Sequence, residues 1–208
     1  MKTSYSVIAV VAVLVAAWFM FGRGEKLPEA TSPEVMAGTT TKLTDGTYKL
    51  DLSKSSIKVT GEYLKGGTEE GVVSFASGSL MTASGQPFAG TFEVDLTTLT
   101  TEGNLVLENY VKGKELLDVD NHPTSTFVIR TITAAPNVAT STGKYIVEGK
   151  LTIKGNTQAL SFPITVSQNG NRIYGHSNFA INRAEWGLDA NNELRNAVLL
   201  DLHIEATK

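Results

Sequence analysis

Apolar and polar residues alternate at every second position through most of the chain after Thr47. In the stretch LSFPITV, residues 160–166, the large apolar side chains occupy the even positions. The same alternation is present in residues 48–52, 57–63, 92–96, 145–153, 173–181 and 198–204, and more weakly around Val73 and Phe127. Because successive side chains of a β-strand point to opposite faces, this period of two predicts many half-buried strands. Several such strands in one chain indicate a sandwich or a closed barrel of about eight strands.

Turn sequences separate these runs. They are Gly66-Gly67, Ser84-Gly85, Pro136-Asn137, Lys154-Gly155-Asn156 and Asn169-Gly170-Asn171. The last predicts a hairpin, because Asn-Gly accepts positive φ at both central positions of a tight turn. Residues 102–119 do not follow the alternation. Leu105, Glu108 and Lys112 have helical spacing there, which predicts a short helix or an irregular crossover.

Composition excludes several classes of function. The 208 residues carry a formal net charge of −3, which gives no electrostatic reason to expect nucleic acid as a partner. The chain has no cysteine, so thiol catalysis, thiolate metal sites and bacterial lipoprotein attachment are excluded. Hydrolase, zinc-protease and phosphate-loop motifs are absent from the sequence, and its carboxylates fall on outward positions. We therefore expect a protein that is not an enzyme and has no cofactor.

The N-terminal segment SVIAVVAVLVAAWFMFG, residues 6–22, has no charge and no proline. Its length is at the lower limit for a transmembrane helix. It ends in large residues, Trp18 to Phe21, which suit an interfacial anchor better than a peptidase site. A cleaved signal peptide and a buried core helix are the alternatives. We predict an anchor or uncleaved signal in residues 1–22, a flexible linker in 23–45 and a barrel domain in 46–208. The barrel would then lie outside the cytoplasm, in the periplasm or at the cell surface, and would be secreted if the segment is cleaved.

Four stretches occur in a characteristic order. They are GTYKLDLSKSSIKVTGEYL (46–64), LENYVKGKELLDVDNHPTSTFVI (107–129), VEGKLTIKGNTQALSFPITV (147–166) and INRAEWGL (181–188). Their order and spacing resemble the YceI-like lipid/polyisoprenoid-binding family. The resemblance implies a lipocalin-like antiparallel barrel, often periplasmic or secreted, that holds a long isoprenoid or fatty chain. An N-terminal helix without a convincing cleavage site departs from the many members that look secreted.

The inward positions of the predicted strands are apolar, which fits either a filled core or a cavity for an apolar ligand. The resemblance favours the cavity. The predicted ligand-binding residues are Phe75, Phe92, Val94, Phe127, Ile129, Val147, Leu151, Ile153, Phe162, Phe179, Ile181, Arg183 and Trp186.

Arg183 follows the inward residue Ile181 by two positions and is expected to point into the barrel near the end of its strand. Its charge would lie over a ligand head group, or it would form a structural ion pair with Asp189, Glu185 or Asp201. Trp186 would close that end of the barrel in either case.

The histidines give little support for a metal site. Asp118, Asp120 and His122 lie within five residues of one another, but their spacing is not typical of zinc or calcium ligands, and a solvated turn explains them. His176 and His203 fall on outward strand positions and are expected at the surface.

The sequence thus predicts a membrane-tethered barrel that carries or sequesters an isoprenoid or acyl lipid, with the membrane as a second partner through residues 6–22. The alternative is a filled barrel that serves as an envelope scaffold or interaction module without a ligand.

Overall fold

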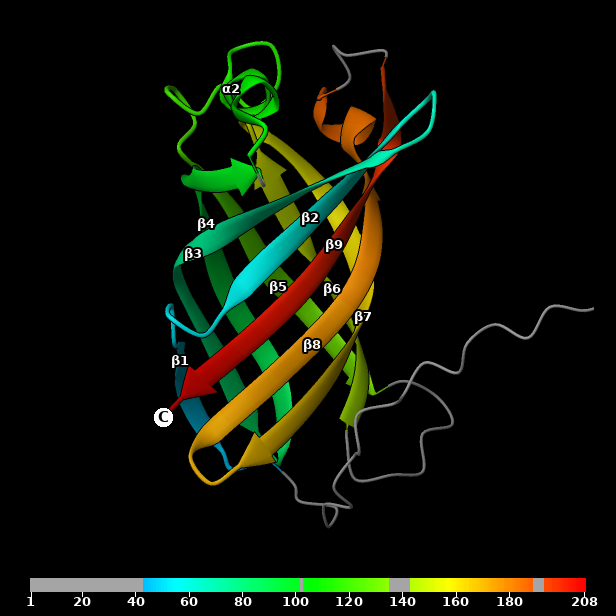
Figure 1. The fold of residues 1–208 in the computed structure, drawn as a ribbon. Helices are drawn as coiled ribbons and strands as arrows, with labels where there is room; N and C mark the ends of the chain where they lie inside the picture. Colours follow the sequence, from blue (N-terminus) through cyan, green and yellow to red (C-terminus); the bar gives the residue numbers. More distant parts are fainter. Residues whose placement is uncertain (1–42, 102, 135–142, 189–192) are drawn as a thin grey trace, which may run out of the picture. The chain divides into compact units, whose positions relative to one another are not determined.

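The computed structural model describes residues 43–101, 103–134, 143–188 and 193–208. Nine β-strands in these residues form one antiparallel sheet (Figure 1). The strands are β1 (Gly46–Leu50), β2 (Ser56–Tyr63), β3 (Thr68–Ala83), β4 (Gln86–Thr101), β5 (Thr124–Ala134), β6 (Gly143–Ile153), β7 (Asn156–Asn169), β8 (Arg172–Asn182) and β9 (Leu194–Thr207).

The sheet closes into a barrel with eight strand positions. From β2 to β9 each strand pairs with the next one along the chain, and β9 returns to pair with β2. The short strand β1 pairs with the far ends of the same two neighbours as β2, namely β3 and β9. The two strands β1 and β2 therefore fill one position in succession, separated by residues 51–55. The pairing is not uniform around the barrel, since β7 pairs with β8 only from Thr165 to Asn169 and β4 pairs with β5 only from Thr91 to Asp95.

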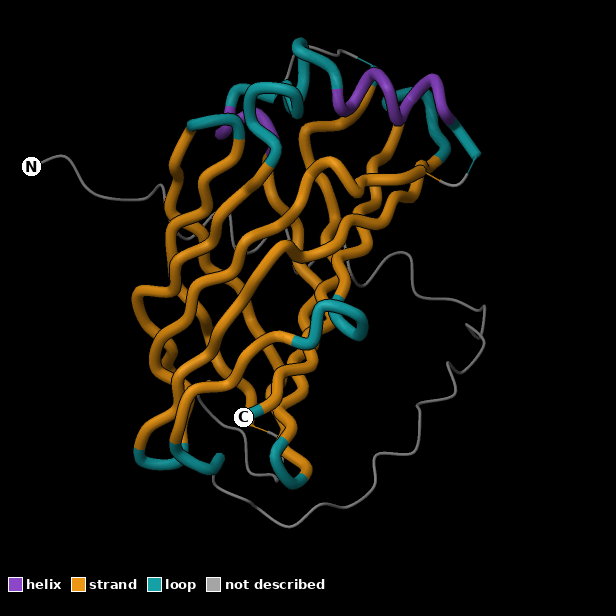
Figure 2. Tube along the Cα trace, turned by 90° about the vertical axis from the view of Figure 1, so that its left-hand side faces the viewer, coloured by secondary structure: helices purple, strands orange, loops and turns teal. Residues whose placement is uncertain are grey.

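The two ends of the barrel are closed in different ways. At one end lie the β3–β4 and β7–β8 turns and the segment from Leu43 to Tyr48, and we call this the sealed end. At the other end lie the helix α2 (Leu105–Lys112), the loop 113–123 and a 3₁₀ helix (Arg183–Trp186), and we call this the capped end. Figure 2 shows the helical segments gathered at one end of the strands.

Helix α2 is held by its terminal hydrogen bonds. The side chain of Asn104 accepts a hydrogen bond from the amide of Leu107 and so acts as the N-cap. Glu108 and Lys112 form an ion pair of 2.9 Å across one helical turn. Leu107 and Val111 face the barrel, whereas Leu105 and Val106 are 68% and 83% exposed. The helix contains no fully buried residue.

Most of the predicted turns are confirmed. Ser84-Gly85 and Lys154-Gly155 have positive φ at both central residues, as a two-residue hairpin with a type I′ turn requires. In the Asn169–Asn171 hairpin only Gly170 has positive φ, so the prediction of positive φ at both central positions is wrong for that turn. The Pro136-Asn137 turn lies outside the described residues.

The predicted antiparallel barrel of about eight strands with a short helical crossover is confirmed. The predicted N-terminal transmembrane helix lies outside the described residues. Within residues 43–101, 103–134, 143–188 and 193–208, no helix is long and apolar enough to cross a membrane. The last three residues assigned to the linker pack on the barrel instead: Leu43 is buried, and the Asp45 carboxylate accepts hydrogen bonds from the Ser84 and Gly85 amides.

Candidate functional site

Two apolar cavities lie inside the barrel. The first, which we call the strand cavity, has a volume of about 120 Å³ and is lined only by residues of β2 to β9. All of its lining residues are apolar. Those that belong to the largest core cluster include Phe75, Leu80, Phe92, Val147, Phe162, Val166, Ile173 and Leu202. A guest in this cavity would meet no hydrogen-bonding side chain.

Aromatic rings form much of the wall of the strand cavity. The rings of Phe162 and Phe179 stack with centroids 4.2 Å apart, and Phe127 lies against Phe162 at 5.5 Å. Phe127 has room because it lies over Gly149, where an added Cβ would come within 2.5 Å of the Phe127 ring. Flat rings in contact give a firm wall because each ring has few rotamers.

The second cavity, which we call the capped cavity, has a volume of about 240 Å³ and lies at the α2 end. Its walls combine strand residues with residues of α2 and of the loop that follows. From that region it is lined by Leu107, Val111, Leu116 and Leu117. Unlike the strand cavity, it also has charged residues in its lining, namely Glu69, Glu70 and Arg183.

The two cavities adjoin one another. Ile57, Val94, Leu151 and Leu200 line both of them. Small-molecule pockets commonly measure about 300–1,000 Å³, and the two volumes reach that range only when taken end to end. The barrel interior is therefore not completely filled, and its free space is divided between two adjacent cavities.

The structure places the predicted lining residues in two groups. Nine of them line the strand cavity: Phe75, Phe92, Val94, Phe127, Ile129, Val147, Leu151, Phe162 and Phe179. Val94 and Leu151 also line the capped cavity, together with Ile153, Ile181 and Arg183. Trp186 lines neither cavity. Contact of these residues with a ligand stays a prediction.

Trp186 lies inside the capped end of the barrel. It is 1% exposed and packs with Leu116 and Leu188 in a second core cluster. Its indole Nε1 donates a hydrogen bond of 3.0 Å to the carbonyl of Leu151. Trp186 is thus held by packing and one buried hydrogen bond, and its role in closing this end stays a prediction.

Arg183 is buried and fastens the connection between β8 and β9. Its guanidinium donates hydrogen bonds to the backbone carbonyls of Leu188, Leu194 and Arg195. Of the carboxylates expected to pair with it, Asp189 lies outside the described residues and Asp201 contacts two histidines, while an ion pair with Glu185 stays a prediction. A head-group contact of Arg183 stays a prediction.

Polar groups at the capped end bind to one another. The Glu69 carboxylate accepts hydrogen bonds from the Asn104 amide at 2.9 Å and from the Tyr63 hydroxyl at 3.3 Å. Burial, with the neighbouring Glu69 carboxylate, raises the pKa of Tyr63, so its hydroxyl keeps the proton that it donates. This network ties the start of α2 to the β2–β3 hairpin.

The predicted solvated turn at His122 is present. The His122 amide donates to the carbonyl of Asp118, and the Asp118 carboxylate accepts from the Asn121 side chain. His176 and His203 lie at the surface as expected, with side chains 54% and 57% exposed.

Sequence reasoning missed the part of the cavity wall that does not come from strands. This part belongs to the short helix and its loop, which are too short for a repeating pattern of apolar residues to identify a buried face. Its residues are Leu107, Val111, Leu116 and Leu117. Their apolar character within an otherwise polar crossover was the available signal. The strand residues Leu200 and Leu202 were predicted to face inward, but they were not included among the candidate ligand contacts.

Fold and cavities together define a closed antiparallel β-barrel with a mostly apolar interior. The chain belongs to the YceI-like family, because the model of the YceI-like domain matches residues 48–206. A comparison with curated proteins finds no match.

Solved structures share this fold. BcnA of Burkholderia cenocepacia is 25% identical, with a TM-score of 0.66 over 76% of this chain and 99% of that chain. A polyisoprenoid binding domain of Saccharophagus degradans is 16% identical, with a TM-score of 0.61 over 77% of this chain and 97% of that chain. The YceI protein of Campylobacter jejuni is 13% identical, with a TM-score of 0.53 over 100% of this chain and 99% of that chain.

Proposed function

We propose that this protein binds one long apolar lipid, an isoprenoid or an acyl chain, along the interior of its barrel. The observation that carries the proposal is the pair of adjoining apolar cavities, which share Ile57, Val94, Leu151 and Leu200. A long chain that occupies both cavities would suit this arrangement better than a compact ligand. Binding without polar contacts depends on apolar area removed from water, at ~25 cal/mol per Å².

The polarity of the two cavities gives the lipid a direction. A hydrocarbon tail suits the strand cavity, whose lining is entirely apolar. The capped cavity is also mostly apolar, but of the two cavities it is the one with charged residues in its lining, so a polar head would lie there. These residues are Glu69, Glu70 and Arg183, and each also binds other groups of the protein. We therefore expect the lipid to enter tail first from the capped end, with its head remaining near α2.

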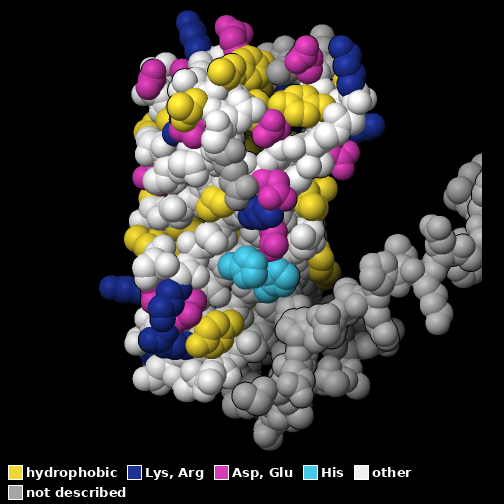
Figure 3. All heavy atoms as spheres, viewed as in Figure 1, with side chains coloured by type: hydrophobic (Ala, Val, Ile, Leu, Met, Phe, Trp, Pro, Cys, Tyr) yellow, Lys and Arg dark blue, Asp and Glu magenta, His cyan; other side chains and the backbone are white. Residues whose placement is uncertain are grey.

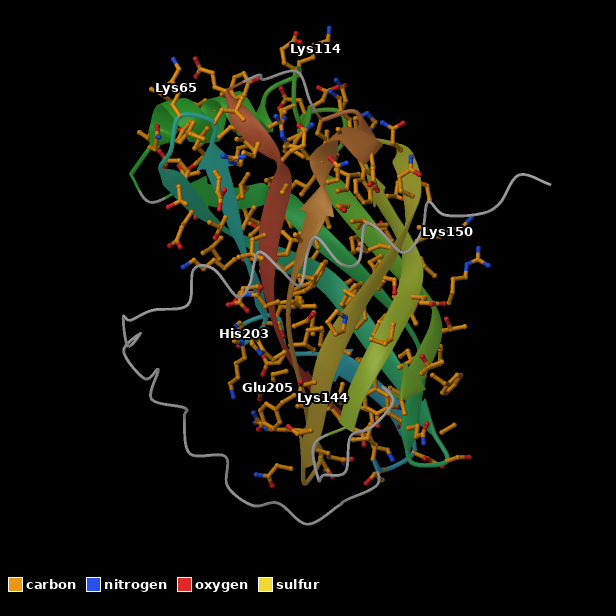
Figure 4. All side chains as sticks on the ribbon, turned by 90° about the vertical axis from the view of Figure 1, so that its right-hand side faces the viewer. Lys65, Lys114, Lys144, Lys150, His203 and Glu205 are labelled. Atoms are coloured by element: carbon orange, nitrogen blue, oxygen red, sulfur yellow. The ribbon has the colours of Figure 1, made fainter. Side chains whose placement is uncertain are left out.

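Helix α2 is the expected gate for this movement. It has no fully buried side chain, and Leu107 and Val111, which line the capped cavity, are only partly buried, so moving the helix should disrupt less packing than moving a strand. Leu64, Leu105 and Val106 are exposed at the capped end, and Figure 4 shows Lys65 and Lys114 at the same end of the barrel. Exposed apolar residues with lysines near them suit contact with a lipid surface.

The family gives independent support for a lipid. The related barrel from Saccharophagus degradans is described as a polyisoprenoid binding domain, and the two chains share their fold. Binding of a guest also fits the absence of hydrogen-bonding side chains from the strand cavity, which offers no group for acid or base catalysis.

The cellular part of the proposal comes from the sequence. The apolar residues 6–22 would anchor the protein in a membrane, with the barrel outside the cytoplasm as a tethered carrier or sequestering protein. Cleavage of that segment would release the barrel as a secreted protein.

The test compares lipid bound by the full chain with lipid bound by two matched variants. Gly175 lines the strand cavity, and a Cβ added there would lie 3.3 Å from Ile164 Cδ1 and 3.4 Å from Ile204 Cβ. Gly175→Val therefore places two methyl groups in the cavity without removing any side chain. Asn178→Val adds the same residue on the exposed face of the same strand. Lipid bound outside the cavity should be equal in the wild type and both variants. A difference in total lipid between the three proteins therefore reports lipid in the cavity.

Each protein is purified in one detergent and extracted with organic solvent, and its lipids are quantified by mass spectrometry. We expect one isoprenoid or acyl chain per wild-type and Asn178→Val molecule, and much less for Gly175→Val. Melting temperature and circular dichroism check that Gly175→Val is folded. Equal lipid in all three proteins would contradict a cavity site. A wild-type protein that stays empty after incubation with polyprenol and fatty acid would instead support the scaffold alternative.

A further inference from the structure

Two imidazoles and a carboxylate meet on the outer face of the barrel, outside the cavities to which we assign lipid binding. His176 on β8 is directly opposite His203 on β9 in the antiparallel register, and Asn178 is opposite Asp201. Residues two apart on a strand share a face, so His176, Asp201 and His203 all project from the same side. Figure 3 shows histidine side chains next to one another on the outer surface of the molecule, and Figure 4 shows His203 on the last strand.

The ligand atoms of these three side chains converge. Nε2 of His176 is 2.8 Å from Oδ1 of Asp201, and Nε2 of His203 is 3.3 Å from the same oxygen. The two imidazole rings lie 4.6 Å apart between centroids. One ligand atom from each residue lies within 4.8 Å of the other two. Zinc binds nitrogen and oxygen at about 2.0–2.2 Å, so ligand atoms around one ion stand roughly 3–4 Å apart.

The donor set selects a class of ion. Two imidazole nitrogens and one carboxylate oxygen suit late first-row transition metals such as Zn²⁺, Ni²⁺ and Cu²⁺. Ca²⁺ and Mg²⁺ prefer six or more oxygens, which this cluster does not offer. Exposure of about half of each imidazole leaves the remaining coordination positions accessible to water.

The surroundings of the cluster are compatible with a cation. On β2, Ser56 is opposite His203 and Lys58 is opposite Asp201, and on β7 Thr165 is opposite His176. Of these three residues, Lys58 alone carries a positive charge, and it forms an ion pair of 2.7 Å with Glu70. His176, Asp201 and His203 lie within the paired part of β8 and β9, so the backbone hydrogen bonds between these strands fix the distances between the three residues.

We propose that His176, Asp201 and His203 form a surface binding site for a late first-row transition-metal ion, with water completing the coordination. Such an ion bridges β8 and β9, the strands that flank the Arg183 connection at the capped end. The site is separate from the lipid cavities, so its test does not depend on the proposed lipid binding.

The test uses the full chain without a histidine tag, titrated calorimetrically with ZnCl₂ and then with NiCl₂. The chain contains three histidines and no cysteine, so His122 is the one imidazole outside the cluster and His122→Gln is the matched control. We expect one ion per wild-type chain and unchanged affinity in His122→Gln. His176→Gln and His203→Gln should each lose at least about tenfold in affinity, since removal of an outer-shell partner of a ligand already costs that much.

A second measurement separates metal binding from a change in folding. Both cluster histidines are exposed, so the metal-free melting temperatures of the variants should match that of the wild type. Added Zn²⁺ should raise the melting temperature of the wild type and of His122→Gln, but not of the cluster variants. Absence of Zn²⁺ and Ni²⁺ binding by the wild type would overturn the proposal. Equal loss of binding in His122→Gln, or equal binding of Mg²⁺, would overturn it as well.

Discussion

The two ends of this barrel are closed by different kinds of structure. At the sealed end Tyr48 is completely buried, and its hydroxyl donates to the carbonyl of Thr44 and accepts from the Gln168 amide. Ile173 and Ala206, each 1% exposed, belong to the same core cluster. At the capped end, α2 covers the larger cavity without one fully buried side chain.

The difference shows how one barrel can combine stability with access. Fully packed apolar groups contribute most of the free energy of folding, so the sealed end should stay closed until the whole domain unfolds. A helix held by its cap, one ion pair and partly buried side chains should open locally. The predictions below test this contrast, from the largest expected effect to the smallest.

Removing the Tyr48 side chain should have the largest effect on stability. Tyr48→Ala deletes a completely buried aromatic ring, so the free energy of unfolding should fall by about 3–5 kcal/mol. Urea denaturation measures this change. Tyr48→Phe is the control, because it removes only the hydroxyl contacts and should cost about 1 kcal/mol. A loss below about 1 kcal/mol for Tyr48→Ala would show that the sealed end is not a stable closure.

The capped end also contains firmly held residues, Trp186 and Arg183, and Arg183 stabilises the β8–β9 connection by buried hydrogen bonds. Arg183→Met leaves the carbonyls of Leu188, Leu194 and Arg195 without this donor, and we expect a loss of about 2–4 kcal/mol in unfolding free energy. Arg183→Lys should recover only part of it, because one ammonium group cannot reproduce the guanidinium fork. Equal stability of both variants and the wild type would mean that the connection is held by packing alone.

The cap of α2 should affect local opening more than global stability. Asn104→Ala removes the N-cap and the hydrogen bond to Glu69, which should cost about 1 kcal/mol, or roughly fivefold in the local opening equilibrium. Hydrogen–deuterium exchange should show faster exchange of the α2 amides and unchanged exchange around Tyr48. Acceleration at both ends would argue against independent opening of the capped end.

The smallest effect is a pH dependence of α2. The hydrogen bond from Lys112, with a second from the Thr101 amide, lowers the pKa of Glu108 below its usual value of 4.5. A carboxylate with a lowered pKa stabilises the folded helix above its unfolded pKa, and this contribution is lost as pH falls through the folded pKa. Exchange protection of α2 should therefore decrease slightly below about pH 4.5. Glu108→Gln should remove that decrease, and a variant that keeps it would exclude Glu108 as its cause.

The sequence predicted the strands better than the closures. Alternation of apolar residues revealed the inward face of β7, because every second residue from Leu160 to Val166 lies inside. It did not reveal the full length of β3, which continues to Ala83 through mostly small and polar residues that interrupt the alternation before Leu80. Strand length there is set by pairing with β1 and β4 and not by the local sequence.

The pairing register also explains what was missed at the surface. His176 and His203 were correctly predicted to face outward, but their juxtaposition depends on the alignment of β8 with β9. A long connection that includes a 3₁₀ helix separates these strands, so no short turn fixes their register in the sequence. The lining residues of α2 were missed for a similar reason, since a helix of 8 residues is too short for its buried face to be identified.

The place where the chain joins the barrel has a mechanical consequence for a tethered protein. Leu43 and Asp45 are fixed beside the β3–β4 turn, so the chain meets the barrel opposite to α2. An anchor in residues 6–22 would therefore be joined to the barrel at its sealed end, the end opposite to α2. Residues 23–42, fully extended, reach at most about 70 Å, and the 16 residues of β3 span about 53 Å. A tether of that length would exceed the length of the barrel, so under the proposed anchoring the end at α2 could still reach the membrane, and shortening residues 23–42 would prevent this.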